Sequence, residues 1–328
     1  MTPSVAGSRV AVMGAGAVGS YFGGMLARAG QEVTLIGRPA HVEAIRRDGL
    51  LLDTASFRER VPITAAVDPS RAQGADFVLF CVKTHSTEEA SRLLARHLAS
   101  SAIVVSLQNG VNNVARIRAA SGIDALPAVV YIAAVLAAPG HVRHSHRGEL
   151  VIGEMRRGGS AESSEAARTD RVSTLFTAAG VPCRVSPNIE GDLWRKMIVN
   201  CAGNAVSAIA QANYGRAIED PGAREVMCRL IGETVAVARA SGVQLPDVDF
   251  VTTGLQFIES IGSTTSSMAQ DIARGRPTEI DSLNGYIAQR GAELGVPVPI
   301  SRTVYALVKL LEKSAAGMEQ RQPAKSSS

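Results

Sequence analysis

Up to residue 185 the chain alternates short, continuous apolar runs with segments of helical period. Apolar runs bounded by turn signals predict strands that are buried on both faces of a parallel sheet. We expect such strands at residues 10–13, 32–36, 76–82, 102–107, 128–136 and 181–185. The helices expected among them run from Ala17 to a C-cap at Gly30, over residues 88–98 and over residues 162–179.

From Gly191 onward the strand signals stop and helical periodicity takes over. Helices are expected at residues 191–210, 222–241 and 300–313, and two more should follow the polar segments 264–268 and 277–281. Ser186-Pro187-Asn188 marks the change of pattern. We therefore predict a first domain at residues 1–187, an all-α domain at 188–314 and a polar, disordered tail at 315–328.

Three glycines follow the first strand and open the first helix. Gly14, Gly16 and Gly19 form G-x-G-x-x-G, in which the first glycine allows a tight turn, the second lets the backbone approach a pyrophosphate, and the third lets helix and strand pack closely. The N-terminus of the following helix favours an anion. This strand–turn–helix context predicts an α/β fold with an N-terminal Rossmann-type dinucleotide-binding domain and a C-terminal all-α domain.

The ends of three predicted strands carry further candidates for the cofactor crevice. After the second strand the chain offers Arg38 and no acidic residue, which suits the 2′-phosphate of NADPH better than the ribose hydroxyl of NADH. The alternative is a solvated basic loop. Lys83 and Asn109 follow two later strands, at the edge where parallel sheets bind ligands, although each could also be a turn or capping residue.

The first helix of the second half carries a polar stripe. Lys196, Asn200 and Asn204 are spaced i, i+4 and i+8, so they fall on one side of a helix whose other positions are largely apolar. The ammonium of Lys196 and the carboxamides of the two asparagines could bind a small polar acid. Alternatively, the stripe is the solvent-facing side of the helix.

Farther on, Thr278 is expected to cap the helix that runs toward Leu294. Glu279 and Asp281 would then lie in its first turn, where the helix dipole favours acidic side chains. For Asp281 we retain this explanation.

Composition narrows the possible partners. The 328 residues carry a formal net charge of +4 with scattered basic residues, so we expect no nucleic-acid partner. Four cysteines without a C-x-x-C pair favour a reducing, cytoplasmic compartment. We see no signal peptide and no apolar run long enough for a bilayer. For His141, His144 and His146 we favour polar faces of a hairpin over a zinc site, because no carboxylate pattern accompanies them.

The ordered set of these motifs resembles the ketopantoate reductases (2-dehydropantoate 2-reductases) from about Arg9 to Lys313. The matching residues are GAGAVG at 14–19, Arg38, VK at 82–83, QNG at 108–110, IGE at 152–154, WRKMIVNCAGN at 194–204, SSM at 266–268 and TEID at 278–281. The resemblance implies NADPH-dependent reduction of 2-dehydropantoate to (R)-pantoate in pantothenate biosynthesis, which feeds the coenzyme A pathway. It leaves a homodimer open.

The resemblance also implies roles for individual residues. Lys196 corresponds to the general acid, and Glu279 to the acid that positions the lysine or the cofactor. Asn200, Asn204 and Ser267 correspond to substrate ligands, and Asn109 to a residue that touches substrate and cofactor. The implied cofactor contacts are Gly14, Ala15, Gly16, Ala17, Val18, Gly19, Arg38, Lys83, Asn109, Ala134 and Glu279.

One departure from the family pattern bears on the substrate. The family commonly has a second Asn-Gly pair about ten residues past the polar stripe, where this chain has Asn213-Tyr214-Gly215. One alternative is therefore a reductase of another 2-keto acid. The others are a nucleotide-binding sensor without turnover and an oxidative decarboxylase resembling 6-phosphogluconate dehydrogenase, against which the TEID and SSM motifs speak.

Overall fold

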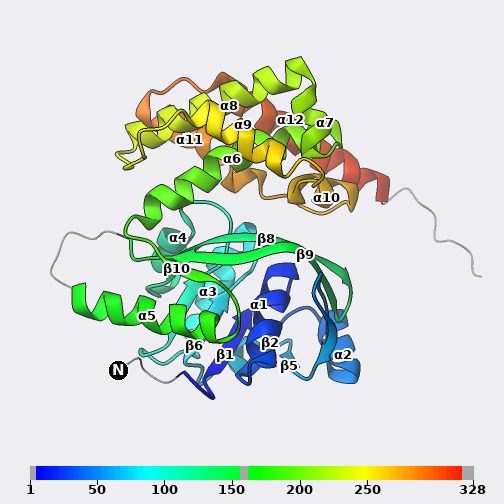
Figure 1. Ribbon diagram of the computed structural model, residues 1–328, viewed down its shortest axis with the longest axis vertical. Coiled ribbons are helices and arrows are strands. Elements are labelled where there is room, and N and C mark those ends of the chain that lie inside the picture. The colour runs from blue at the N-terminus through cyan, green and yellow to red at the C-terminus, as the bar shows by residue number, and fades with distance from the viewer. Residues whose placement is uncertain (1–4, 156–161, 320–328) are drawn as a thin grey trace, which may run out of the picture. The chain divides into compact units, whose positions relative to one another are not determined.

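The computed structural model describes residues 5–155 and 162–319, which belong to two compact units (Figure 1). The first is Met1–Asp192 and the second is Leu193–Ser328. The division falls inside helix α6 (Ile189–Ala210), whereas the sequence placed it just before this helix. No helix in the described part of the chain is long and apolar enough to cross a bilayer.

A mainly parallel sheet forms the centre of the first unit, as the α/β class predicts. Its order is β4-β3-β9-β8-β7-β6-β1-β2-β5, with β10 paired to β9. The run from β5 to β8 is parallel, and β8 and β9 form a long antiparallel hairpin. The strands are β1 (Arg9–Met13), β2 (Glu32–Ile36), β3 (Leu50–Asp53), β4 (Arg58–Val61), β5 (Thr64–Ala66), β6 (Phe77–Phe80), β7 (Ile103–Ser106), β8 (Leu126–Ala138), β9 (His141–Ile152) and β10 (Cys183–Val185).

Helices cover both faces of this sheet, which is why the central strands β6 and β7 are buried at every position. Val10 and Val12 of β1 belong to a core with residues of α1, α2 and α5. Ala11 and Met13 point to the other face, into a core with residues of α3 and α4. These helices are α1 (Ala17–Arg28), α2 (Pro39–Asp48), α3 (Thr87–Ala95), α4 (Asn113–Ser121) and α5 (Glu162–Ala178), and short 3₁₀ turns are η1 (Pro69–Ala72) and η2 (Thr84–Ser86).

The described part of the second unit contains helices and no strand, which confirms the predicted all-α character. Its helices after α6 are α7 (Tyr214–Glu219), α8 (Pro221–Ala240), α9 (Phe250–Ser260), α10 (Ser267–Ala273), the 3₁₀ turn η3 (Ile280–Ser282), α11 (Asn284–Leu294) and α12 (Pro299–Glu319). Side chains cap several of them: those of Asn213, Asp220, Asp249 and Ser266 accept backbone N–H bonds at helix starts.

Two terminal predictions need correction. Helix α1 ends at Arg28 with Ala29 as its C-cap, one position earlier than predicted, and Gly30 follows at φ +86°. Helix α12 continues to Glu319, so its backbone occupies the start of the segment 315–328 that composition assigned to a disordered tail. The remainder of that segment lies outside the described residues.

Candidate active site

The glycine turn after β1 has the geometry that the motif predicts. Gly14 adopts φ +107°, and a Cβ placed there would lie 2.6 Å from the backbone nitrogen of Val82. A Cβ on Gly19 would lie 2.3 Å from the carbonyl oxygen of Gly14. A Cβ on Gly16 would meet nothing within 4 Å. Gly14 and Gly19 are therefore required by packing, while Gly16 leaves open space above the start of α1.

The backbone amides of the turn divide into two groups. Gly14 N and Ala15 N both donate to Ile36 O, at 3.0 and 2.9 Å, and thereby tie the turn to β2. The first amides of α1, beginning at Ala17, have no acceptor within the helix. No acidic side chain lies in this first turn. An exposed glycine beside the first amides of a helix fits the pyrophosphate of a dinucleotide. The amide of Ala15 already donates to Ile36 O.

The strand register brings the other predicted cofactor residues to the same edge of the sheet. Met13 pairs with both Ile36 and Phe80, and Phe80 pairs with Ser106, so the carboxyl ends of four strands are level. Beyond these ends lie Arg38 and Lys83, both exposed, and Asn109, which is half-buried. Because β1 lies between β2 and β6, the edge at this point is a topological switch, where open α/β sheets bind ligands.

Gln108, quoted in the QNG motif, joins two of these strand ends. Its Nε2 donates to Val82 O at 3.0 Å and to Thr87 Oγ1 at 2.8 Å, and its Oε1 accepts from Ser106 Oγ at 3.0 Å. The side chain is buried and fully engaged. Gln108 therefore holds the segments that follow β6 and β7 together.

The β8–β9 hairpin contains Ala134 and the three histidines. Ala134 is half-buried and pairs in register with His144, whose ring stacks on Tyr21 with 4.4 Å between centroids. His141 Nε2 lies 3.0 Å from Asp53 Oδ2. One of the three histidines therefore lies beside a carboxylate, which the sequence pattern did not predict. That carboxylate belongs to Asp53 of β3, which is distant in the sequence. Among the described residues no group of three such side chains could hold a metal ion.

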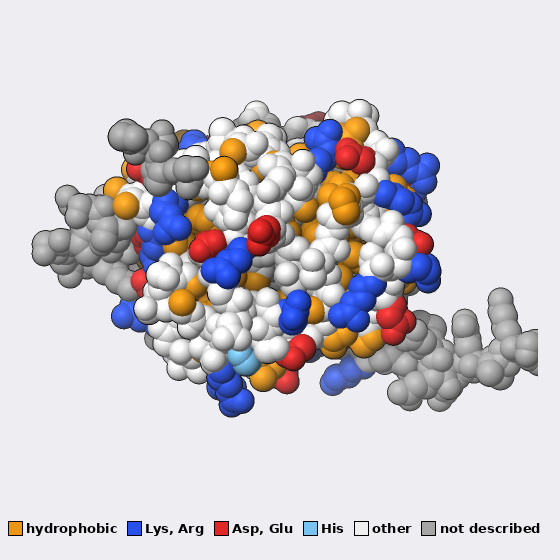
Figure 2. Space-filling model, turned by 90° about the horizontal axis from the view of Figure 1, so that it is seen from below, with side chains coloured by type: hydrophobic (Ala, Val, Ile, Leu, Met, Phe, Trp, Pro, Cys, Tyr) orange, Lys and Arg blue, Asp and Glu red, His pale blue; other side chains and the backbone are white. Residues whose placement is uncertain are grey.

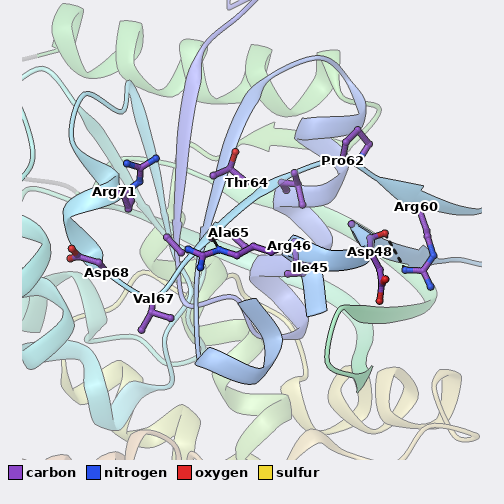
Figure 3. A pocket seen from close by; sticks show the side chains of 13 residues that line it. Ile45, Arg46, Asp48, Arg60, Pro62, Thr64, Ala65, Val67, Asp68 and Arg71 are labelled. Carbon is purple, nitrogen blue, oxygen red and sulfur yellow. Dashed lines mark hydrogen bonds between the residues drawn. The ribbon is translucent and has the colours of Figure 1, made fainter. Parts of the chain in front are cut away.

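A separate pocket of about 830 Å³ opens beside β5 and the end of α2 (Figure 3). Several of its polar side chains are bonded to the protein itself. Arg46 Nε donates to Ala65 O, Arg60 Nη1 donates to Asp48 O, and Asp68 accepts from Ser70. None of the predicted site residues lines it. On the face seen in Figure 2, basic and acidic side chains are interspersed rather than gathered by sign.

In the second unit, the polar stripe of α6 is not a solvent-facing surface. Lys196 and Asn200 are half-buried, and Asn204 is only 6% exposed. The side chain of Asn200 makes no hydrogen bond to another described residue, so its amide donor and its carbonyl acceptor are both available to a ligand. Burying such groups is costly unless they are satisfied, which favours the ligand-binding interpretation of the stripe.

Tyr214, the residue that differs from the family pattern, makes a hydrogen bond to the stripe. Its hydroxyl donates to Asn204 Oδ1 at 2.7 Å. The ring packs against Gly203, where a Cβ would lie 2.9 Å from Cε1 of the tyrosine. Burial raises the pKa of the phenol, so the hydroxyl keeps its proton. The sequence showed this tyrosine as an irregularity but gave no indication that it would engage the stripe.

The segments that carry Ser267 and Glu279 both lie beside α6. Ser266 Oγ donates to Asn204 O at 3.4 Å, and Asn284 Nδ2 donates to Cys201 O at 3.0 Å. Ser267 is exposed at the first position of α10, and Glu279 is half-buried immediately before η3. The second unit thus brings both segments close to the stripe.

The expectations for Thr278 and Asp281 were wrong in detail. Helix α11 begins at Asn284, so Thr278 does not cap it; Thr278 Oγ1 accepts from Ile280 N and donates to Glu312 Oε1. Asp281 is not explained by a helix dipole alone, because it accepts from Tyr305 and Lys309 of α12, at 2.8 and 3.0 Å. These long-range partners were invisible in the local pattern.

Comparison with known proteins identifies the family. Residues 10–157 match the family model for ketopantoate reductase PanE/ApbA, and residues 188–312 match the model for its C-terminal part. The chain is 35% identical over 308 residues to a 2-dehydropantoate 2-reductase of Halobacterium salinarum, covering 93% of this chain and 99% of that protein.

Solved structures agree with this assignment. A PanE/ApbA family ketopantoate reductase from Ralstonia eutropha JMP134 superposes with a TM-score of 0.86 at 50% identity, covering 94% of this chain and 99% of that one. A D-mandelate dehydrogenase, solved with NADH and anilino(oxo)acetate, gives a TM-score of 0.85 at 26% identity, with the same coverage. With its glycine turn, its strand-end residues and its α6 stripe, this chain belongs to the ketopantoate reductase family, a family of oxidoreductases.

Proposed function

We propose that the protein reduces 2-dehydropantoate to (R)-pantoate with NADPH, with Lys196 as the general acid. The observation that carries the proposal is the partly buried line of Lys196, Asn200 and Asn204 on α6, in a chain whose first unit holds an open glycine turn. The first unit would hold the dinucleotide, and the helical unit would supply the groups that bind and protonate the keto acid. The cysteines are unpaired thiols, which supports a reducing, cytoplasmic setting.

The bound cofactor supplies a hydride to the C2 carbonyl carbon of the substrate. The residues of this chain stabilise and protonate the oxygen on which negative charge develops. The Lys196 ammonium can approach that oxygen and donate its proton, a contribution typically worth about 10²–10⁴ in rate. Glu279 would keep the ammonium charged and oriented. Asn200, Asn204 and Ser267 would donate to the substrate carboxylate and its other oxygens.

Arg38 supports the choice of NADPH. It is exposed at the carboxyl end of β2, one residue before α2, where a 2′-phosphate would lie. Its guanidinium could bind that phosphate through two parallel hydrogen bonds. Asn109 and Lys83 would contact the remainder of the cofactor from the ends of β7 and β6, and Ala134 would do so from β8.

The direct experiment is NADPH oxidation by the purified protein with 2-dehydropantoate, followed at 340 nm and paired with chiral identification of pantoate. We expect turnover and the (R) product. Binding of NADPH without oxidation of it by any keto acid would support the sensor instead, and release of CO₂ from a hydroxy acid would support the decarboxylase.

A second candidate is the reduction of a different 2-keto acid. Two observations favour it: Tyr214 occupies Oδ1 of Asn204, and a similar structure is that of a D-mandelate dehydrogenase. Steady-state kinetics with a panel of 2-keto acids separates the two candidates. A kcat/KM for an aromatic or branched 2-keto acid that exceeds the value for 2-dehydropantoate would favour the second.

A further inference from the structure

Tyr214 and Asn204 form a buried hydrogen-bonded pair in the helical unit. The phenol donates to Asn204 Oδ1 at 2.7 Å, and both side chains are less than a tenth exposed. The tyrosine is fixed from two sides. Its backbone nitrogen donates to Thr264 O at 3.0 Å, and its ring lies against Gly203 with no room for a Cβ between them. The phenol therefore cannot easily move away from the carboxamide.

This hydrogen bond fixes the orientation of the Asn204 carboxamide, and therefore which of its atoms, Oδ1 or Nδ2, faces a ligand. If the amide turned over, its Nδ2 would face the phenol, and the buried phenol proton would lose its acceptor. Such a loss is costly. The observed orientation leaves Nδ2 without an acceptor among the described residues. At this position of the stripe, the protein thus presents a donor, and the phenol already uses one of the two lone pairs of Oδ1.

We propose that Tyr214 is a specificity-determining residue of the keto-acid site: by holding Oδ1 of Asn204, it biases the site toward 2-keto acids whose carbon chain carries no hydroxyl group. The inference rests on the proposed function, in that the α6 stripe is taken to bind the keto acid. Lys196 is also a pure donor. The Lys196 ammonium and Asn204 Nδ2 can both donate to the carboxylate and ketone oxygens of a 2-keto acid. A substrate hydroxyl would also need an acceptor for its proton, and Asn204 Oδ1 already accepts from Tyr214.

The test uses two keto acids that differ by one hydroxyl group, 2-dehydropantoate and 3,3-dimethyl-2-oxobutanoate. We define the hydroxyl ratio as kcat/KM for the first divided by kcat/KM for the second. Tyr214→Phe frees Oδ1 of Asn204, and the hydroxyl ratio should rise about threefold to tenfold, the effect of one hydrogen bond. In an Asn204→Ala background the same substitution should leave the ratio unchanged.

Tyr305→Phe is the matched control, because it removes a phenol that bonds to Asp281 instead. It should leave the hydroxyl ratio at the wild-type value. A second variant, Asn204→Asp, keeps one oxygen for Tyr214 and offers another to the ligand, so it should also raise the ratio even though the added charge weakens both reactions.

An unchanged or lower hydroxyl ratio in Tyr214→Phe or in Asn204→Asp would overturn the inference. So would the same rise in the Asn204→Ala background. Failure of the proposed function looks different, because the wild type would then reduce neither keto acid. The ratio of the two dissociation constants, measured by calorimetry with the NADP⁺-loaded protein, tests Tyr214 without turnover and should shift by the same factor.

Discussion

Glu312 accepts two hydrogen bonds from Thr278, one from its backbone nitrogen at 2.8 Å and one from its hydroxyl at 2.7 Å. Glu312 also pairs with Lys309 at 2.9 Å, and Lys309 pairs with Asp281. The short segment around Glu279 is therefore fastened to α12 on both sides of that residue. This arrangement explains how a turn without regular helix can hold a candidate catalytic carboxylate in place.

Removal of the Glu312 carboxylate should loosen this segment. Thr278 is buried, so Glu312→Ala leaves two donors without their acceptor and should lower the free energy of unfolding by about 2 kcal/mol. Glu312→Gln retains an acceptor oxygen and should cost less than half of that. Chemical unfolding followed by circular dichroism measures both. Glu293→Ala, at a more exposed ion pair, is the control, and an equal loss in all three variants would refute the anchoring role.

The second and third glycines of the motif should respond differently to substitution. At Gly16 a Cβ meets nothing within 4 Å, so Gly16→Ala should keep the melting temperature and weaken NADPH binding by obstructing the pyrophosphate. At Gly19 a Cβ would lie 2.3 Å from a backbone oxygen, so Gly19→Ala should lower the melting temperature as well. Thermal unfolding and cofactor titration by fluorescence measure these effects. Unweakened NADPH binding in Gly16→Ala would count against the assigned pyrophosphate site.

Arg38 should set the preference between the two nicotinamide cofactors. Arg38→Gln removes the charge that would face the 2′-phosphate, so the dissociation constant for NADPH should rise about 10- to 100-fold while that for NADH stays nearly constant. Isothermal titration with each cofactor gives the comparison. Arg47→Gln removes an exposed arginine of α2 that pairs with Asp48, and it should change neither constant. If NADH binding falls as much as NADPH binding, Arg38 does not read the phosphate.

A buried histidine should make the first unit acid-sensitive. Gly140 N donates to His41 Nδ1 at 2.9 Å, Ser20 Oγ lies 3.1 Å from Nε2, and burial lowers the pKa of the ring. The unfolded chain therefore takes up the proton more readily. Stability should be full above about pH 6.5 and should fall as the pH drops through the folded-state pKa. Burial also lowers the pKa of His144, which adds in the same direction.

Unfolding at about pH 7.5 and about pH 5.5 measures this dependence. The wild type should be less stable at the lower pH, and the difference should shrink in His41→Gln. His85→Gln, which replaces an exposed histidine, should retain the wild-type difference. An undiminished difference in His41→Gln would show that other groups govern acid sensitivity.

The sequence could predict elements whose signal is local. The glycine turn and the mostly apolar runs of β1, β2, β6 and β7 were predicted, because parallel strands covered on both faces contain few polar residues. Strands β3, β4 and β5 were missed. Segment β4 is RERV and β5 is TAA, and neither is apolar enough or alternates clearly enough to predict a strand. Their pairing partners are supplied by distant parts of the chain.

The same division holds for the candidate site. The i, i+4, i+8 spacing of Lys196, Asn200 and Asn204 is a helical property and could be seen in the sequence. The contacts of Asn204 with Tyr214 and of Thr278 with Glu312 join residues on different helices, so no periodicity reveals them. The burial of Asn204, which weighs against the solvent-face alternative, is likewise not visible in the sequence.

The central claim is that Lys196 protonates the ketone of a substrate, and Lys196→Ala tests it most directly. Arg195→Ala, which removes the exposed cation beside it, is the matched control. We predict that kcat for the reduction of 2-dehydropantoate, or of whichever 2-keto acid the wild type reduces best, falls about 10²- to 10⁴-fold in Lys196→Ala. The dissociation constant for NADPH should stay near the wild-type value. A kcat equal to that of the wild type and of Arg195→Ala would contradict the account.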